Sequence, residues 1–381
     1  SIIPEGCRWR DWAIDNKDGQ ALTGDDLLNF INNTLFPALK ELAVSAETPK
    51  RQAIVKYVFE DANNYMKNGT LLRQVINILN EIDFTEHDDS HTFNDIYESI
   101  LKDLQSAGDS GEFYTPRPVT DFMVEMLNPQ IHEKIADFAC GTGGFLTSIL
   151  KFMEDNITTQ KDKEMVQRNL FGIEKKPLPY LLAITNLILH NIDAPNIIHD
   201  NSLTKNVRDY KENEKFNVIV MNPPYGGTEE NAIRINFPTA LQSSETADLF
   251  VALILYRLKE GGRVGIVMPD NFLSGGETSQ KNLKEKLLNE CDLHTIIRLP
   301  EGVFSPYTNI KTNLLFFSKT GPTNKIDYYE VQLPEGYRTF SKTKPFKNEH
   351  LQEAREWWLN RTPEDKNSYT VTIEEIKDAK Y

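Results

Sequence analysis

The sequence predicts an α/β protein in which a Rossmann-like, mostly parallel sheet follows an N-terminal helical domain. Three observations support this fold class. Short apolar runs alternate with helical stretches over residues 117–319, as in βαβ units. Polar residues follow four of these runs, which is typical of a ligand-binding sheet edge: Asp137, Glu174, Asn201 and Asn222. The segment up to residue 107 shows helical periodicity.

Two apolar stripes at helical spacing lie in this first segment. One consists of Leu71, Leu72, Val75, Ile76, Ile78 and Leu79, and the other of Tyr97, Ile100, Leu101 and Leu104. Residues 106–111 are small and turn-forming, so we interpret them as a linker. The predicted parts are therefore a helical domain over 1–107, an α/β domain over 108–325 and a C-terminal extension over 326–381.

Seven strands are predicted in the α/β domain, at 134–138, 169–173, 196–199, 216–221, 262–268, 293–299 and 312–318. Helices are expected between several of them, at 117–127, 144–155, 177–191 and 246–259. Strands that alternate with helices imply a sheet covered on both faces. The pattern weakens after residue 325, where a helix is predicted over 349–360 and a further element over 370–377.

The composition is that of a globular protein, with 39% hydrophobic and 26% charged residues. No apolar run approaches the roughly 20 residues that span a bilayer, so no membrane partner is expected. Three distant cysteines favour a reducing cytoplasm over a disulfide framework. No metal is expected, because the cluster around His87 and His91 lacks a completing Cys or His pair. The first residue is Ser1, which indicates a fragment or a processed product.

A glycine-rich turn follows the first predicted strand, where Asp137 leads through Thr142, Gly143 and Gly144 into a helix. Glycines let the backbone approach a ligand, and the helix presents free amides there. The spacing is not that of a dinucleotide site or a phosphate loop. The next strand ends at Glu174, whose carboxylate can accept hydrogen bonds from both ribose hydroxyls of an adenosyl group. A surface glutamate at a strand end is the alternative.

The sequence Asn222-Pro223-Pro224-Tyr225 follows the apolar run 216–221. The exocyclic amino group of a nucleobase is a poor nucleophile, because its lone pair is delocalised into the ring. Acceptors on Asn222 and Pro223, aimed at the two amino hydrogens, would free that lone pair. The prolines restrict the backbone, and Tyr225 offers a stacking face worth about 1–3 kcal/mol per base. The base must first leave the duplex.

Methylation of a cytosine ring carbon would instead need a cysteine nucleophile, typically after proline. The three cysteines follow Gly6, Ala139 and Glu290, which argues against that chemistry. A simple strand-ending turn is the alternative interpretation of the Asn-Pro-Pro-Tyr segment.

These two motifs resemble those of amino-group methyltransferases that use S-adenosylmethionine. The chain as a whole resembles the modification subunit of type I restriction–modification systems, an adenine-specific DNA methyltransferase. The resemblance covers nearly the whole length and is strongest over 111–319. Beyond the two motifs, it is carried by residues 191–203, 248–250, 261–271, 297–304 and 311–317. Family members extend beyond both ends, which implies that the helical domain and the C-terminal extension are truncated.

The resemblance implies roles for particular residues. S-adenosylmethionine is expected to contact Asp137, Thr142, Gly143, Gly144 and Glu174, together with the upstream residues Glu112, Phe113, Tyr114, Thr115, Pro116 and Arg117. Asn222, Pro223, Pro224 and Tyr225 would hold the flipped adenine. Phe304 is a candidate second stacking residue, with core packing as the alternative. The family has a Gly-Asp pair where this chain has Asp200-Asn201, so either residue is a candidate cofactor contact.

The resemblance also implies partners: double-stranded DNA, a specificity subunit shared by two modification subunits, and a restriction subunit. The net charge of −14, from 56 acidic and 42 basic residues, agrees with this division of labour. Contacts to DNA phosphates need a basic surface. Either the basic residues therefore cluster on one face, or another subunit supplies much of the affinity for DNA.

Two other functions remain open at this point. A protein methyltransferase acting on glutamine carries a similar turn, because a side-chain amide resembles the amino edge of adenine. A catalytically idle scaffold subunit would only bind a partner, although it would have no need of an intact Asn222-Pro-Pro-Tyr225 segment. For the helical front domain, plain packing is expected, with closure over DNA as the alternative.

Overall fold

The computed structural model describes residues 2–15, 19, 21–45, 47–60, 62–81, 97, 114–305, 308, 310–361 and 365–379. Several predicted features lie outside the described residues: the linker at 106–111, all of the second apolar stripe except Tyr97, and the histidines His87 and His91. Within the described part of the chain, no helix is both long and apolar enough to cross a membrane.

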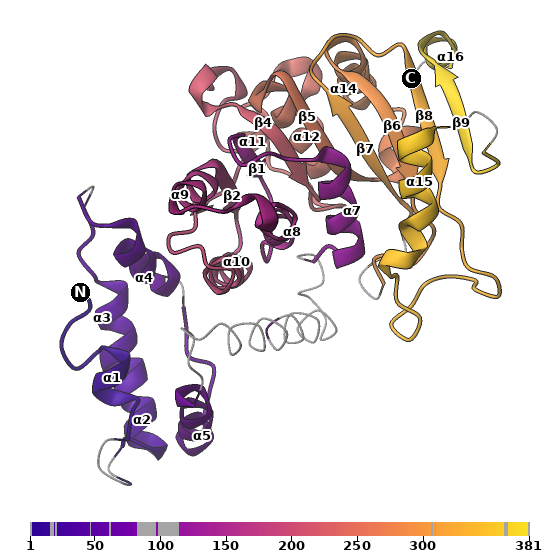
Figure 1. Cartoon of the computed structure of the whole chain (residues 1–381). Helices are drawn as coiled ribbons and strands as arrows, with labels where there is room; N and C mark the ends of the chain where they lie inside the picture. The colour runs from indigo at the N-terminus through magenta and orange to yellow at the C-terminus, as the bar shows by residue number, and fades with distance from the viewer. Residues whose placement is uncertain are drawn as a thin grey trace.

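A nine-stranded sheet in the order β3-β2-β1-β4-β5-β7-β6-β8-β9 forms the centre of the molecule (Figure 1). The strands are β1 Ile135–Asp137, β2 Leu170–Glu174, β3 Ile197–His199, β4 Phe216–Met221, β5 Leu258–Pro269, β6 Asp292–Arg298, β7 Thr312–Ser318, β8 Lys325–Glu330 and β9 Ser368–Thr372. All seven predicted strands are present. The sequence prediction missed β8, and it anticipated β9 only as an element beginning near residue 370.

The sheet is mostly parallel, as predicted. Five neighbouring pairs are parallel, from β3 through β5 and between β6 and β8, and the three other pairs are antiparallel. Because β7 runs against both β5 and β6, those two strands share one direction with β1 to β4 and β8. The carboxyl ends of all these strands therefore meet along one side, which we call the carboxyl edge.

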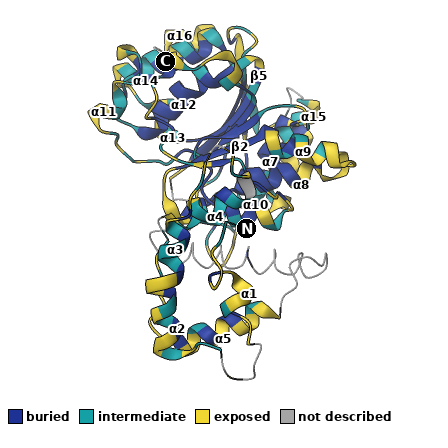
Figure 2. Ribbon diagram, turned by 90° about the vertical axis from the view of Figure 1, so that its left-hand side faces the viewer, coloured by how far each residue is buried: buried dark blue, intermediate teal, exposed yellow. Residues whose placement is uncertain are grey.

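Two hydrophobic layers cover the faces of the sheet. One contains buried side chains from α7 (Arg117–Leu127), α8 (Gly144–Met153), α10 (Pro177–Leu189) and α15 (Gln352–Asn360). The other contains α12 (Thr246–Arg257) and α14 (Thr278–Glu290). The central strands β4 and β7 are buried on both sides, which explains their continuous apolar sequence (Figure 2).

The predicted helices correspond to α7, α8, α10, α12 and α15, although α12 ends at Arg257 because β5 begins at Leu258. The remaining helices are α9 (Gln160–Asn169), α11 (Asn231–Arg234), α13 (Asp270–Ser274), α16 (Ile373–Asp378) and the short 3₁₀ turns at 154–156, 207–209, 212–214, 239–241 and 348–351. Because β8 and β9 extend the sheet, the predicted division at residue 325 does not coincide with an edge of it. The three-part division as a whole stays a prediction.

The N-terminal segment is helical and has a small core of its own, formed among others by Leu27, Ile31 and Ile76. Its elements are α1 (Trp9–Trp12), α2 (Gly24–Phe30), a π-helical turn (Ile31–Leu35), α3 (Phe36–Lys40), α4 (Lys50–Glu60) and α5 (Gly69–Asn80). The predicted stripe over 71–79 lies on α5, where Ile76 is buried but Leu71, Val75 and Ile78 are exposed.

Candidate active site

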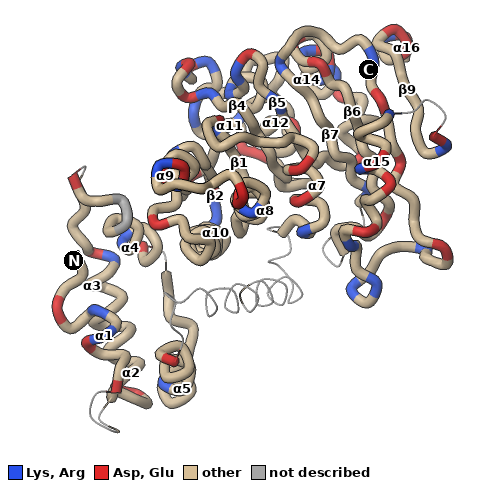
Figure 3. Tube along the Cα trace, in the orientation of Figure 1, with Lys and Arg blue, Asp and Glu red and all other residues tan. Residues whose placement is uncertain are grey.

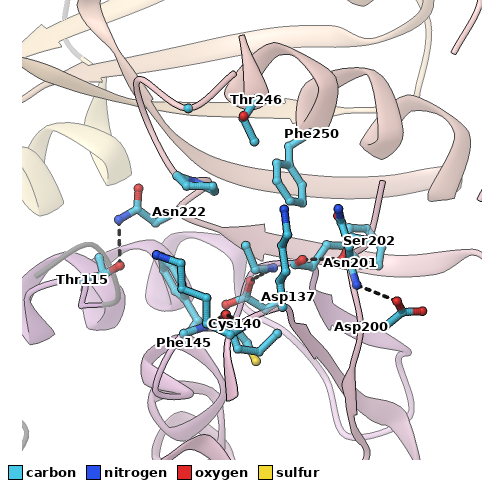
Figure 4. A pocket seen from close by; sticks show the side chains of 18 of the residues that line it. Thr115, Asp137, Cys140, Phe145, Asp200, Asn201, Ser202, Asn222, Thr246 and Phe250 are labelled. Atoms are coloured by element: carbon cyan, nitrogen blue, oxygen red, sulfur yellow. Dashed lines mark hydrogen bonds between the residues drawn. The ribbon is translucent and has the colours of Figure 1, made fainter. Parts of the chain in front are cut away.

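The carboxyl edge holds a cavity of about 280 Å³ between the ends of β1, β2, β3 and β4 (Figure 4). Residues from all four strand ends line it, together with the entry to α7 and the start of α12. Of the predicted site residues, Thr115, Asp137, Gly144, Glu174, Asp200, Asn201, Asn222 and Pro224 line this cavity. Segments that are far apart in the sequence therefore meet at the position that the strand pattern predicts.

The glycine turn between β1 and α8 forms the floor of the cavity. Gly143 has a φ of +81°, a left-handed conformation that side chains rarely adopt, and this residue caps α8. The Asn186 side chain donates to the Thr142 carbonyl at 3.0 Å, so α10 holds the turn in place. Thr142 and Gly143 thus support the turn without themselves lining the cavity.

Arg117 braces the same turn from α7. Its Nη1 donates to the Gly144 carbonyl and to the Thr147 hydroxyl oxygen, each at 2.7 Å. The guanidinium therefore contacts the first turn of α8, and Arg117 is not among the cavity residues. Tyr114 is buried, and Glu112 and Phe113 lie outside the described residues.

Two buried carboxyl groups stand side by side at the ends of β1 and β2. Glu174 Oε2 accepts from the Gly141 amide at 2.9 Å, and its Oε1 accepts from the Lys176 amide at 2.8 Å. Burial raises the pKa of Glu174. Burial also raises the pKa of Asp137 to about 8, with a further contribution from the nearby Glu174 charge. Each carboxylate oxygen keeps a lone pair for a ligand hydroxyl or ammonium group.

The end of β3 contributes a third polar group. Asp200 Oδ1 accepts from the Asn201 amide at 2.7 Å, and Asn201 Oδ1 accepts from the Leu203 amide at 3.0 Å. Figure 4 shows both side chains on the side of the pocket opposite Asn222. Both residues line the cavity, so either can contact a ligand, and the two alternatives stay open.

Asn222 directly follows β4 and lines the cavity. Its Nδ2 donates to Thr115 Oγ1 at 3.0 Å, and its Oδ1 accepts from the Tyr225 hydroxyl. Burial raises the pKa of the Tyr225 phenol, which therefore stays protonated as a donor. Pro223 is buried, whereas Pro224 lines the cavity.

Phe304 does not reach this site in the structure. The side chain is 4% exposed and belongs to the hydrophobic layer that contains α7 and α15. Core packing, the alternative interpretation of this residue, describes its position here, and its stacking role stays a prediction.

Other cavity residues were missed by the sequence analysis. Phe145, Lys175, Lys176 and Ser202 each adjoin a predicted residue, so extending the motifs by one or two positions would have found them. Gly227, Thr228, Glu229 and Thr246 come from the segment after Tyr225, which folds back so that Thr228 pairs with Glu245. No sequence motif signals that return. Phe250 lies in the family segment 248–250, one turn into α12.

The cavity residues suit S-adenosylmethionine. Carboxylates at Asp137 and Glu174 match ribose hydroxyls and positive charge, and Phe145 and Phe250 offer apolar surface for an adenine ring. Polar acceptors surrounded by apolar walls are typical of a small-molecule site.

Comparison with known proteins decides the family. The model of the N-6 DNA methylase family matches residues 88–381. The chain belongs to the N-6 DNA methylase family. It is 49% identical over 98% of its length to the EcoEI type I methylase subunit of Escherichia coli, of which it covers 77%, and 28% identical to the EcoKI type I methylase subunit of Escherichia coli K12, of which it covers 66%.

Solved structures agree with this membership. A modification subunit from Vibrio vulnificus YJ016 is 41% identical, with a TM-score of 0.86 over 98% of this chain and 81% of that one. A chain solved in work on complex assembly of the type I R–M system is 38% identical, with a TM-score of 0.90 over 100% of this chain and 78% of that one. The predicted fold, reaction class and S-adenosylmethionine cofactor of this methylase are thereby confirmed.

Proposed function

We propose that this methylase is the modification subunit of a type I restriction–modification system. It transfers a methyl group from S-adenosylmethionine to the exocyclic amino group of an adenine flipped out of double-stranded DNA. A separate specificity subunit, shared by two copies of the methylase, selects the DNA sequence, and a restriction subunit joins the complex. DNA methylation by this complex takes place in the cytoplasm. The observation that carries the proposal is the fixed carboxamide of Asn222 at the cavity wall.

The chain's residues act on the base by orientation. Asn222 Oδ1 and the Pro223 carbonyl accept the two amino hydrogens of adenine, which concentrates the nitrogen lone pair toward the cavity. Tyr225 keeps Oδ1 in position and offers its ring to the base. Bound S-adenosylmethionine supplies the electrophilic methyl group. No covalent intermediate with the protein is needed, because positioning alone can lower such a barrier by several kcal/mol, up to roughly 7–11.

The cofactor is held on the other side of the cavity. Glu174 accepts from the ribose hydroxyls, while Asp137 faces the positively charged part of the ligand. The glycine turn is held in one conformation, because Arg117 and Asn186 donate hydrogen bonds to the carbonyls at its two ends. The positions of Glu174 and Asn222 in the cavity lining support binding of a cofactor and a base on opposite walls of one cavity.

A labelled methyl-transfer assay tests the function. The methylase with its specificity subunit, incubated with duplex DNA and methyl-labelled S-adenosylmethionine, should produce N6-methyladenine. Asn222→Ala should abolish transfer and leave cofactor affinity, measured by calorimetry, largely unchanged, because Asn222 contacts the base. Turnover of the variant near the wild-type rate would contradict the mechanism. Labelling of protein glutamine instead of DNA would favour the glutamine methyltransferase alternative.

A further inference from the structure

One loop at the carboxyl edge concentrates positive charge in a chain whose net charge is −14. Residues 332–347 connect β8 to the 3₁₀ turn before α15. They carry four exposed cations, Arg338, Lys342, Lys344 and Lys347, against a single carboxylate, Glu335. In Figure 3, blue basic stretches lie on the loop that descends beyond α15. We call this segment the basic loop.

The cations of the basic loop are mostly unneutralised. Lys347 Nζ lies 3.8 Å from Glu349 Oε1. Lys344 Nζ lies over the Tyr337 ring, 4.5 Å from the ring centroid. Arg338 and Lys342 form no ion pair with any described residue. Four exposed cations on one short loop create a local positive potential, so the loop is suited to an anionic partner.

The basic loop is anchored rather than loosely attached. Phe340 is 1% exposed and packs with Tyr337, Phe346 and His350, at ring-centroid distances between 4.8 and 5.8 Å. Backbone hydrogen bonds between Ser341 and Lys344 close a tight turn that presents the lysines. A fixed loop loses little conformational entropy when it binds, so its cations are pre-arranged for a partner.

The anchor point places the loop at the carboxyl edge, where Asn222 also lies. The Phe340 amide and the Thr339 hydroxyl donate to the Glu301 carbonyl, in the turn that follows β6 at the carboxyl edge. Gly302 has a φ of +84°, and a Cβ there would lie 2.3 Å from the Phe340 carbonyl oxygen. This close approach admits only glycine and fixes the loop against the turn.

The distance to Asn222 suits a DNA duplex. β6 and β8 lie three and four strands from β4 in the sheet, which corresponds to about 14–19 Å at about 4.8 Å per strand. That lateral span equals roughly four to six base-pair steps of about 3.4 Å. Tyr225 packs against both hydrophobic layers, and Leu333 and Tyr337 of the basic loop pack against the layer that contains α7 and α15.

We propose that the basic loop binds backbone phosphates of duplex DNA several base pairs from the flipped adenine. This inference rests on the proposed function, because it takes DNA as the substrate. The loop would position the duplex without reading its sequence, since phosphate contacts carry no sequence information. It would also explain how an acidic subunit contributes to DNA binding.

The test compares two triple variants in the complex with the specificity subunit. The loop variant is Arg338→Gln, Lys342→Gln and Lys344→Gln. The control removes the same charge from exposed lysines outside the basic loop, on α9 and α16, by Lys161→Gln, Lys163→Gln and Lys377→Gln. DNA affinity is measured across a series of salt concentrations, alongside thermal unfolding and cofactor affinity for each variant.

Each phosphate contact adds about 0.9 to the slope of log affinity against log salt. The loop variant should therefore lower the magnitude of the slope by about 2.7 if all three contacts are made, whereas the control should leave it unchanged. Equal slopes for wild type and loop variant would overturn the proposal. So would loss of specificity-subunit binding without DNA, which would make the loop a protein contact. Wild-type methyl transfer in the same preparations checks the proposed function separately.

Discussion

Asn222 donates its side-chain amide hydrogen to the Thr115 hydroxyl oxygen, although the two residues lie 107 positions apart in the sequence. The bond determines which way the carboxamide faces. Because Nδ2 is directed to Thr115, Oδ1 is left as the acceptor that points to Tyr225 and the base side. Thr115 also lines the cofactor cavity, so this residue belongs to both halves of the active site.

Replacing Thr115 by Val should lower the turnover number of the methylase. Valine has nearly the same shape but cannot accept the hydrogen bond, so the Asn222 carboxamide becomes free to rotate. A neutral hydrogen bond contributes about 0.5–1.5 kcal/mol, which corresponds to a roughly 2- to 13-fold loss in turnover. Steady-state kinetics at saturating DNA and cofactor measure this loss.

Thr115→Ser is the matched control, because serine keeps the hydroxyl and should restore most of the activity. Cofactor affinity, measured by calorimetry, separates an orientation effect from a damaged cofactor site. A wild-type turnover number for Thr115→Val would show that Asn222 is oriented by Tyr225 alone.

Glu174→Ala should weaken S-adenosylmethionine binding by about 1.5–3 kcal/mol, the range for hydrogen bonds to a charged group. The carboxylate also accepts from the amides of Gly141 and Lys176, so part of the loss comes from the released turn. Glu174→Gln keeps one acceptor oxygen and should fall between the wild type and Glu174→Ala. An unchanged dissociation constant for Glu174→Ala would mean that the ribose is bound elsewhere.

The central sheet was predictable because its strands are buried on both faces and read as unbroken apolar runs. The helix α9 was missed because its sequence, Gln160–Asn169, is largely polar, with Val166 and Asn169 as its buried residues. β9 is an edge strand whose side chains are all intermediate or exposed, so little of its sequence is constrained by burial. Hydrophobic patterns in the sequence reflect burial, and few residues of α9 and β9 are buried.

Some features of the candidate site were predictable from the sequence, and others were not. Asp137, Glu174 and Asn222 were predictable because each follows a recognisable strand. The brace from Arg117 to Gly144 and the support of Thr142 by Asn186 were not, because they join helices that are distant in the sequence. Arg117 was expected to contact the cofactor, whereas the structure shows it holding the backbone beneath the cofactor cavity.

Cofactor affinity should rise with pH as a result of Asp137. Its pKa of about 8 means that the free protein carries a proton there at neutral pH. S-adenosylmethionine has a net positive charge, and a bound cation favours the ionised carboxylate, so binding releases the proton. Below the raised pKa, affinity should therefore increase by up to about tenfold per pH unit.

Calorimetry between about pH 6 and about pH 7.5 measures this dependence, since the amino group of the ligand stays mostly charged in that range. Proton release also appears as a dependence of the binding heat on the buffer used. Asp137→Asn should bind with an affinity that varies much less over the same interval. A wild-type affinity that falls as pH rises would contradict the assignment of Asp137 as the group beside the positive charge.

The isolated methylase should neither select a DNA sequence nor methylate efficiently. Its net charge of −14 opposes association with a polyanion, and the basic loop offers at most four phosphate contacts. In the proposed function, the residues of its active site contact one cofactor and one base, which is too little to define a long recognition site. Adding the cognate specificity subunit should create both sequence-specific binding and activity.

Gel-shift and methylation assays on a DNA library, with the full-length subunit alone and with its specificity subunit, measure this difference. DNA binding by the subunit alone and by the complex should depend differently on salt concentration. The methylase alone should bind all sequences equally and lose that binding as salt increases, because its contacts are to phosphates. The complex should keep a preference for its own site at salt concentrations where the lone subunit no longer binds. Sequence-selective methylation by the subunit alone would refute delegated recognition and would make this chain a self-sufficient adenine methyltransferase.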